Sequence, residues 1–279
     1  MIEPALSDDA FLADVRATRG ISGLHLWWLG QSGFLLHHEG RFALLDPYLS
    51  DSLTNKYAAT DKPHVRMTRR VVDPARLGFV HVISSSHNHT DHLDADTVAP
   101  VLAAHPKVKL VIPEANRDFV AQRLRIPPHV PEGVEDGMSV KAAGFEFHGV
   151  AAAHERREVD EQGRDRFLGY VVRAGPYSVY HSGDTVTYVG IVEKVWPFHV
   201  DVALLPINGR APARRVAGNL DGREAAFLAN DIGAKLVIPC HYEMFEFNTA
   251  DPREQFAPEC ERLGQPYKVL RAGERWSMP

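Results

Sequence analysis

The chain has 279 residues, of which 44% are hydrophobic and 24% are charged, and its formal net charge is −5 at pH 7. This is the composition of a globular protein with its own core, and the acidic balance excludes the basic surface by which proteins bind nucleic acid. Two cysteines cannot form a disulfide framework, and no apolar stretch approaches the roughly 20 residues that a membrane span needs. The first residues show no signal-peptide pattern, so we expect a soluble, cytoplasmic protein.

Short apolar runs separated by glycines dominate the start of the chain and predict antiparallel strands. A helical segment precedes them, and a polar, irregular stretch at 50–72 follows them as a long excursion near the predicted site. Strands and helices then alternate up to a turn-rich stretch at 127–137. The elements predicted in this half are helices at 8–18, 94–104 and 114–124 and strands at 24–29, 34–38, 42–45, 80–83 and 108–112.

The pattern of strands and helices restarts after residue 137. One of the helices begins with Asp221-Gly222-Arg223-Glu224, a variant of the capping box. The elements predicted in this half are strands at 145–151, 167–173, 178–181, 202–205, 235–239 and 267–270 and helices at 221–232 and 252–263.

The apolar character of the strands determines the expected architecture. Because such strands must be covered on both faces, we predict an α/β (α+β) fold in which two mixed sheets pack face to face with helices outside, a four-layer αββα sandwich. The whole chain, 1–279, would form one domain with two halves in pseudo-repeat, at about 20–137 and 138–279.

Residues 87–92 read His-Asn-His-Thr-Asp-His and follow the strand predicted at 80–83. In extended backbone, residues two apart point the same way, so His87 and His89 can converge on one point. Asp91 and His92 come after the chain turns and can face a second point. Imidazole and carboxylate are the ligand types that hold zinc, manganese or iron. The alternative is a histidine-rich surface turn, but such a turn would not predict partners elsewhere in the chain.

Candidate partners occur in four further segments, each at the place where a predicted strand runs into a loop. Strand ends on one rim of a sandwich are near one another in space, although they are far apart in sequence. Five histidines and three aspartates can therefore gather at one rim. The four additional residues are Asp46, His154, Asp184 and His241.

These motifs, in their order along the chain, resemble the metallo-β-lactamase superfamily, whose fold is an αββα sandwich. Several segments resemble more closely the branch that contains ascorbate-6-phosphate lactonase, and phospholipase D enzymes that hydrolyse N-acylphosphatidylethanolamine are more distant. The segments that carry this closer resemblance are 28–33, 180–184, 201–206 and 234–239. Antibiotic hydrolysis is disfavoured, because the true β-lactamases that use a cysteine ligand place it where this chain has Asp184.

The resemblance implies two divalent metal ions per chain, zinc or manganese, with iron as a further option. One ion would be held by three neutral imidazoles and the other by two imidazoles and a carboxylate, with one aspartate bridging them. The implied ligands are His87, His89 and His154 for the first ion, Asp91, His92 and His241 for the second, and Asp184 as the bridge.

The implied chemistry is hydrolysis by a hydroxide that bridges the two metals. The substrate would be a lactone or related ester, with or without a phosphate group. Asp91 would be a ligand and would also carry the proton to the leaving group. His181 either acts in the site or packs in the core, and we expect Asp46 to hydrogen-bond a ligand histidine. A phosphodiesterase of the phospholipase D-like branch is the alternative, and a non-catalytic metal-binding or sensing domain is the least favoured reading.

Substrate contacts are expected from loops at the same rim. Asn208 and Arg210 lie in a polar, basic loop after the strand at 202–205, and arginine suits a bidentate grip on phosphate or carboxylate. Tyr48 and Tyr242 each stand one or two residues from a site residue and are further candidates. The expected partner is a small molecule, anionic where arginine grips it, and a homo-oligomer is left open. The remaining histidines, His64 among them, show no partner pattern and are expected to be structural or exposed.

Overall fold

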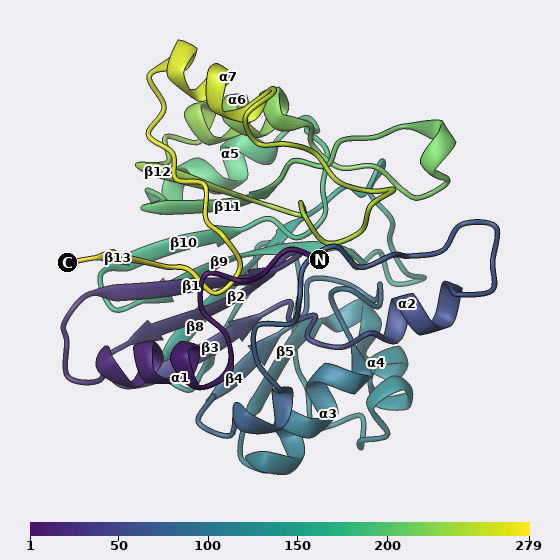
Figure 1. The fold of residues 1–279 in the computed structure, drawn as a ribbon, viewed down its shortest axis with the longest axis vertical. Coiled ribbons are helices and arrows are strands. Elements are labelled where there is room, and N and C mark those ends of the chain that lie inside the picture. The colour runs from purple at the N-terminus through teal and green to yellow at the C-terminus, as the bar shows by residue number, and fades with distance from the viewer.

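The strands of the computed structural model, which describes residues 1–279, form two sheets that pack face to face (Figure 1). The first sheet contains β1 Leu24–Gly30, β2 Gly33–His38, β3 Arg41–Leu45, β4 Val82–Ser84, β5 Lys109–Pro113, β6 Glu132–Val134 and β13 Arg275–Met278. Its strand order is β13-β1-β2-β3-β4-β5-β6. The second contains β7 Ser139–Ala142, β8 Phe145–Ala151, β9 Leu168–Ala174, β10 Tyr177–His181, β11 Val202–Pro206 and β12 Leu236–Cys240. Its order is β12-β11-β10-β9-β8-β7.

Helices cover the outer faces of both sheets. The helices are α1 Asp8–Ala17, α2 Ser52–Tyr57, α3 Ala95–Ala104, α4 Arg117–Leu124, α5 Ile191–Val195, α6 Gly222–Asp231 and α7 Phe256–Leu263. In Figure 1, α5, α6 and α7 lie beyond the second sheet and α1, α3 and α4 lie beyond the first. The predicted four-layer αββα arrangement of two mixed sheets is confirmed.

Burial explains why the central strands read as continuous apolar runs. All seven residues of β1 and all five of β11 are buried, because each strand is covered by the facing sheet on one side and by helices or loops on the other. One hydrophobic cluster of 66 buried residues draws on both sheets. This continuous core fixes the positions of the strand ends that carry the site.

Helix α6 begins as its sequence predicts. The Asp221 side chain accepts a hydrogen bond from the Glu224 backbone N–H at 2.9 Å, and the Glu224 side chain accepts one from the Asp221 N–H at 3.0 Å. Two N–H groups that lack helical partners are thereby satisfied.

The end of the chain differs from the prediction. Residues 267–270 make only an isolated bridge, between Tyr267 and Val237, and the last strand is instead β13. This strand crosses to the first sheet and pairs antiparallel with β1, with Met278 opposite Leu24. It was not predicted because it is a half-exposed edge strand without an apolar run. The predicted division near residue 137 therefore assigns every strand except β13 to the correct sheet.

Smaller differences concern short elements. The helix predicted at 114–124 begins with a 3-10 turn at Glu114–Asn116, and the excursion at 50–72 contains α2. None of the helices combines the length and the apolar character that crossing a bilayer requires.

Candidate metal centre

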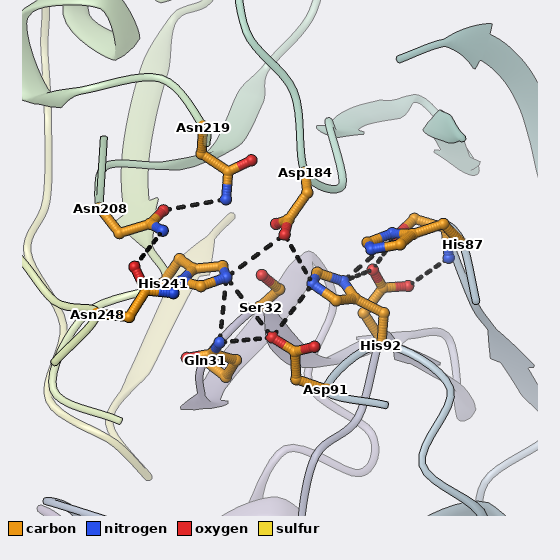
Figure 2. Close-up of polar contacts among 12 residues, drawn as sticks. Gln31, Ser32, His87, Asp91, His92, Asp184, Asn208, Asn219, His241 and Asn248 are labelled. Carbon is orange, nitrogen blue, oxygen red and sulfur yellow. Dashed lines mark hydrogen bonds and ion pairs between the residues drawn. The ribbon is translucent and has the colours of Figure 1, made fainter. Parts of the chain in front are cut away.

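The predicted ligands come from four strand ends on one rim of the sandwich. The motif at 87–92 starts three residues after β4, His154 follows β8, Asp184 follows β10, and His241 comes directly after β12. Figure 2 shows that Asp91, His92, Asp184 and His241, which come from three of these segments, point toward a common centre. The strand-end argument therefore predicted correctly that these side chains gather at one rim.

Two groups of donor atoms form at this centre, and within each group the atoms lie within 4.8 Å of one another. The first group contains His87, His89, His154 and Asp184, and the second contains Asp91, His92 and His241. Asp184 also reaches the second group, because its Oδ2 lies 3.3 Å from His92 Nε2 and 3.5 Å from His241 Nε2. This grouping matches the ligand sets that the sequence resemblance implies, including the bridging position of Asp184.

Unsatisfied polar atoms indicate that these residues suit metal ions. His87 Nε2, His92 Nε2 and Asp184 Oδ1 are buried and have no hydrogen-bond partner. Leaving such atoms unpaired destabilises a fold. Convergent imidazole nitrogens and carboxylate oxygens are the donor set of zinc, manganese and iron. The residues present therefore fit two divalent cations.

Hydrogen bonds behind the centre orient the imidazoles. Asp46 is fully buried, and its Oδ2 lies 2.6 Å from His92 Nδ1, so that His92 Nε2 faces the centre. Asp46 Oδ1 accepts from the Ser86 backbone N–H at 2.8 Å. His154 Nδ1 lies 2.9 Å from the Gly218 carbonyl oxygen, which leaves its Nε2 for the centre. The Asp46 contact is the one that the sequence predicts, and such contacts fix both tautomer and ring orientation.

Electrostatic interactions keep the bridging carboxylate ionised. Burial by itself would raise the pKa of Asp184, but the neighbouring His92 and His241 outweigh it and hold that pKa well below its usual range. Burial would lower the pKa of His92, yet the carboxylates of Asp184 and Asp91 raise it well above the ordinary value. The directions of both pKa shifts favour an ionised Asp184 carboxylate between the two donor groups.

Gln31 is a site residue that no motif singled out for a role. It is fully buried, and its Nε2 donates to Asp91 Oδ2 at 2.7 Å (Figure 2). Its backbone oxygen accepts from the His241 N–H at 2.9 Å, so one residue touches both Asp91 and His241. The available signal was a polar residue within the segment Gly30–Gly33 between two buried strands, but sequence spacing does not show which carboxylate it meets.

Of the two roles predicted for His181, action in the site or packing in the core, the structure favours the second. Its ring is buried, Nε2 lies 2.8 Å from the Ser32 carbonyl oxygen, and Nδ1 accepts from the Gly183 N–H at 3.3 Å. It does not line the cavity. Both ring nitrogens are engaged by backbone, so His181 supports the turn that carries Asp184, and we do not retain it as a catalytic residue.

A cavity of about 300 Å³ opens beside the two donor groups. The residues that line it from the centre itself are His89, Asp91, His154, Asp184 and His241. Its other walls come from α2 and the following loop, from Asn88, Thr90 and Arg123, from 216–217 and from the segment 245–248. His64, which was expected to be structural or exposed, is among these lining residues.

The two tyrosines predicted to contact substrate do not line this cavity. The Tyr48 hydroxyl is buried and accepts from the Leu53 N–H at 3.1 Å. The Tyr242 hydroxyl donates to the Leu270 carbonyl oxygen, and the ring stacks on Trp28 with centroids 4.2 Å apart. Proximity along the chain misled here, because a residue next to a ligand can point into the core. Neither tyrosine is retained as a substrate contact.

The predicted substrate contacts in the basic loop after β11 also bond to other groups of the protein. Arg210 pairs with Glu224, with Nη1 2.8 Å from Oε2, and lies outside the cavity lining. Asn208 is buried and does not line the cavity either. It instead donates through Nδ2 to Asn248 Oδ1 at 3.0 Å, and Asn248 does line the cavity.

A chain of amides orients Asn248 (Figure 2). Arg214 Nη1 lies 3.3 Å from Asn248 Oδ1, and a guanidinium can only donate, so this atom must be the amide oxygen. Asn208 then also donates to that oxygen, and Asn219 Nδ2 donates to Asn208 Oδ1 at 3.1 Å. With its oxygen engaged twice, Asn248 has its Nδ2 donors available to the cavity.

A family model described as a beta-lactamase superfamily domain matches residues 25–241, a span that includes all seven predicted ligands. The chain belongs to the β-lactamase superfamily. A protein of Opitutus terrae named "UPF0173 metal-dependent hydrolase" is 30% identical over 256 residues, which cover 90% of this chain and 98% of that protein. The predicted family is therefore confirmed.

Two further similarities are more distant. The "Probable L-ascorbate-6-phosphate lactonase UlaG" of Escherichia coli is 26% identical over 263 residues, covering 82% of this chain and 72% of that protein. A solved metallo hydrolase from Ignicoccus hospitalis superposes with a TM-score of 0.67 at 20% identity, covering 92% of this chain and 99% of that one. The structural similarity supports the fold.

Proposed function

We propose that this protein is a metal-dependent hydrolase that cleaves a carboxylic ester or lactone. The observation that carries the proposal is the pair of donor groups, connected through Asp184, that opens onto one cavity of about 300 Å³. The relatives support it, since the Opitutus terrae protein is named a metal-dependent hydrolase and the Escherichia coli protein a lactonase.

Each side chain of the centre has a chemical task. When bound, two divalent cations lower the pKa of coordinated water and polarise a carbonyl group. Asp91 lines the cavity, and Gln31 holds its Oδ2 at 2.7 Å, so the carboxylate is fixed beside the reacting atoms. It accepts the proton of the attacking water and returns it to the leaving alkoxide oxygen.

Asn248 supplies a hydrogen-bond donor in the lining of the same cavity. Its Nδ2 donates to the substrate carbonyl oxygen, and the fixed amide chain prevents it from turning its oxygen toward that atom. Asp46 and the Gly218 carbonyl hold His92 and His154 in place throughout. These residues orient groups and do not themselves exchange protons with the substrate.

A substrate panel tests the proposal and separates it from phosphodiester hydrolysis. Protein reconstituted with Zn²⁺ or with Mn²⁺ is assayed on γ- and δ-lactones, on p-nitrophenyl esters and on bis-p-nitrophenyl phosphate. We expect ester or lactone turnover that is lost in His89→Ala and strongly reduced in Asp91→Asn. Turnover of the phosphodiester alone would overturn the assignment to carboxylic esters.

A further inference from the structure

We propose that the cavity selects carbonyl substrates with an uncharged aromatic arm, and that this arm packs against Tyr57, His64, Phe245 and Phe247. These four residues are called the aromatic wall below. The inference rests on the proposed hydrolase function, because it describes what the same cavity accepts. It also departs from the sequence expectation of an anionic substrate gripped by arginine.

The aromatic wall is one continuous packed surface. The His64 ring stacks on Tyr57, with centroids 4.1 Å apart and an interplanar angle of 17°. The same ring meets Phe247 edge to face at 4.6 Å and Phe245 at 5.2 Å. All four residues line the cavity together with Asp91 and His241. An aromatic arm on a substrate held at the ligands would therefore reach aromatic rings directly.

His64 packs in this surface as an aromatic ring. Burial lowers its pKa, so at neutral pH the imidazole is uncharged. Its Nδ1 lies 3.2 Å from the Lys62 carbonyl oxygen and its own backbone oxygen accepts from Thr54 Oγ1 at 2.8 Å. These contacts fix the ring at the centre of the wall.

The two segments that carry the wall, 57–67 and 244–247, are joined by backbone hydrogen bonds. The Met67 N–H donates to the Met244 carbonyl oxygen at 2.8 Å, and the Glu246 N–H donates to the Val65 carbonyl oxygen at 3.2 Å. Arg66 lies between the segments, with Nε 2.6 Å from Asp51 Oδ1 and Nη1 3.1 Å from Met244 Sδ. The wall is thus formed before any ligand arrives, which reduces the ordering cost of binding.

The arginines that could grip a phosphate are engaged elsewhere. Arg210 pairs with Glu224, and Arg215 pairs with Asp61 at 2.8 Å. Arg214 donates to Asn248 and to the Thr249 carbonyl oxygen, at 3.3 and 3.2 Å.

Arg123, which lines the cavity, is partly engaged, through one terminal nitrogen and through its guanidinium, which lies 4.4 Å from the Phe119 ring centroid. Its Nη1 donates to the carbonyl oxygens of Asn88 and Leu93, at 2.6 and 3.2 Å.

Lys56 remains at the mouth, exposed and 5.0 Å from the Tyr57 ring centroid. The Lys62 ammonium lies 5.9 Å from the Phe247 ring centroid and donates to the Ala213 carbonyl oxygen. Ammonium groups at the surface are weak anchors for a doubly charged group, so the cavity favours an uncharged arm.

Binding of metal-chelating probes tests this selectivity without turnover. The probes are acetohydroxamate, phenylacetohydroxamate and phosphonoacetohydroxamate, titrated calorimetrically into Zn²⁺-loaded protein. All three share the hydroxamate, and because a phosphonate can also bind the metals, a difference in Kd is assigned to the arm only where the wall variants below change it. We expect phenylacetohydroxamate to bind on the order of tenfold or more tightly than acetohydroxamate, because its ring is buried against other rings. Phosphonoacetohydroxamate should bind no more tightly than acetohydroxamate.

Two wall variants assign the effect to these residues. Phe247→Ala and Tyr57→Ala should each remove most of the preference for the phenyl probe and change the Kd of acetohydroxamate by less than about twofold. Trp196→Ala, which removes an exposed aromatic ring outside the cavity lining, is the matched control and should preserve the preference. Metal content is measured for every variant.

The outcomes separate the two proposals. Equal affinity for the phenyl and methyl probes, or tightest binding of the phosphono probe, would overturn the aromatic arm even if lactones are hydrolysed. A phenyl preference that survives both wall variants would also overturn it. A wall-dependent preference in a protein that hydrolyses no ester or lactone would support the wall as a binding surface and would reject the hydrolase proposal instead.

Discussion

The two sides of the cavity are built in different ways. The ligand side consists of residues at strand ends, most of them buried, whose orientation is fixed by hydrogen bonds to Asp46, Ser86 and the Gly218 carbonyl. The opposite side consists of loops and the short helix α2, whose rings are held by stacking on one another. Reaction chemistry requires fixed atoms, whereas substrate selection requires only a surface of the right kind. Under the proposed function, the difference separates residues that would carry out the reaction from residues that would select the substrate.

Backbone conformation sharpens this contrast. Asp46 and His241, both on the ligand side, have φ values of 41° and 64°, in the left-handed region that non-glycine residues rarely occupy. The Asp46 N–H donates to the Ser84 carbonyl oxygen at 3.0 Å, and the His241 N–H donates to the Gln31 carbonyl oxygen at 2.9 Å. The sheet structure thus maintains an unfavourable local conformation where ligands must converge.

The largest effect should come from removing a ligand. In His89→Ala the first donor group loses its most exposed member. We expect metal content to fall below two ions per chain and ester turnover to drop on the order of 10³-fold or more, since Lewis-acid stabilisation is worth several kcal/mol. Elemental analysis and steady-state kinetics measure both. His129→Ala, at an exposed histidine outside the cavity, should retain metal and turnover. Full activity in His89→Ala would reject the dinuclear centre.

The next effect concerns proton transfer. Asp91→Asn keeps the shape of the side chain but removes the base that Gln31 orients. Turnover should fall by roughly 10²–10⁴-fold, the range typical of general acid–base groups. Gln31→Glu is the companion variant, because it replaces the donor to Asp91 by a carboxylate and should also reduce kcat. Both proteins are compared after reconstitution with Zn²⁺, and an Asp91→Asn enzyme with near-normal kcat would exclude Asp91 as the base.

A smaller loss should follow from disturbing the support of a ligand. Asp46→Asn replaces the carboxylate that lies 2.6 Å from His92 Nδ1, and asparagine tolerates the positive φ at this position. Metal affinity should weaken by about 10–100-fold, as is usual when such a partner is changed. Competition with a chromogenic chelator measures the change. Unchanged affinity would mean that the hydrogen bond does not tune the centre.

The same contrast explains what the sequence could predict. The clustering of His87, His89, His154 and His241 was predictable because a motif of period two and strand ends on a common rim bring these side chains together. Gln31, His64 and Asn248 were not, because their roles depend on how loops return to the cavity. The strand β13 escaped prediction because a half-exposed edge strand has no apolar pattern, although the two-sheet architecture follows from the buried strands.

The smallest effect should come from Arg210, the residue that the sequence favours as an anion clamp. Its guanidinium is 47% exposed and pairs with Glu224, the residue that closes the capping box of α6. Arg210→Ala should therefore lower the free energy of unfolding by no more than about 1 kcal/mol, the usual range for exposed ion pairs. The KM for an uncharged ester should change by less than about twofold, because no bond from Arg210 reaches the cavity. Arg210→Lys should restore part of any lost stability in thermal unfolding. A large rise in KM for phosphorylated esters alone, with stability unchanged, would contradict this expectation. It would show that Arg210 leaves Glu224 and binds an anionic substrate, as the sequence predicts.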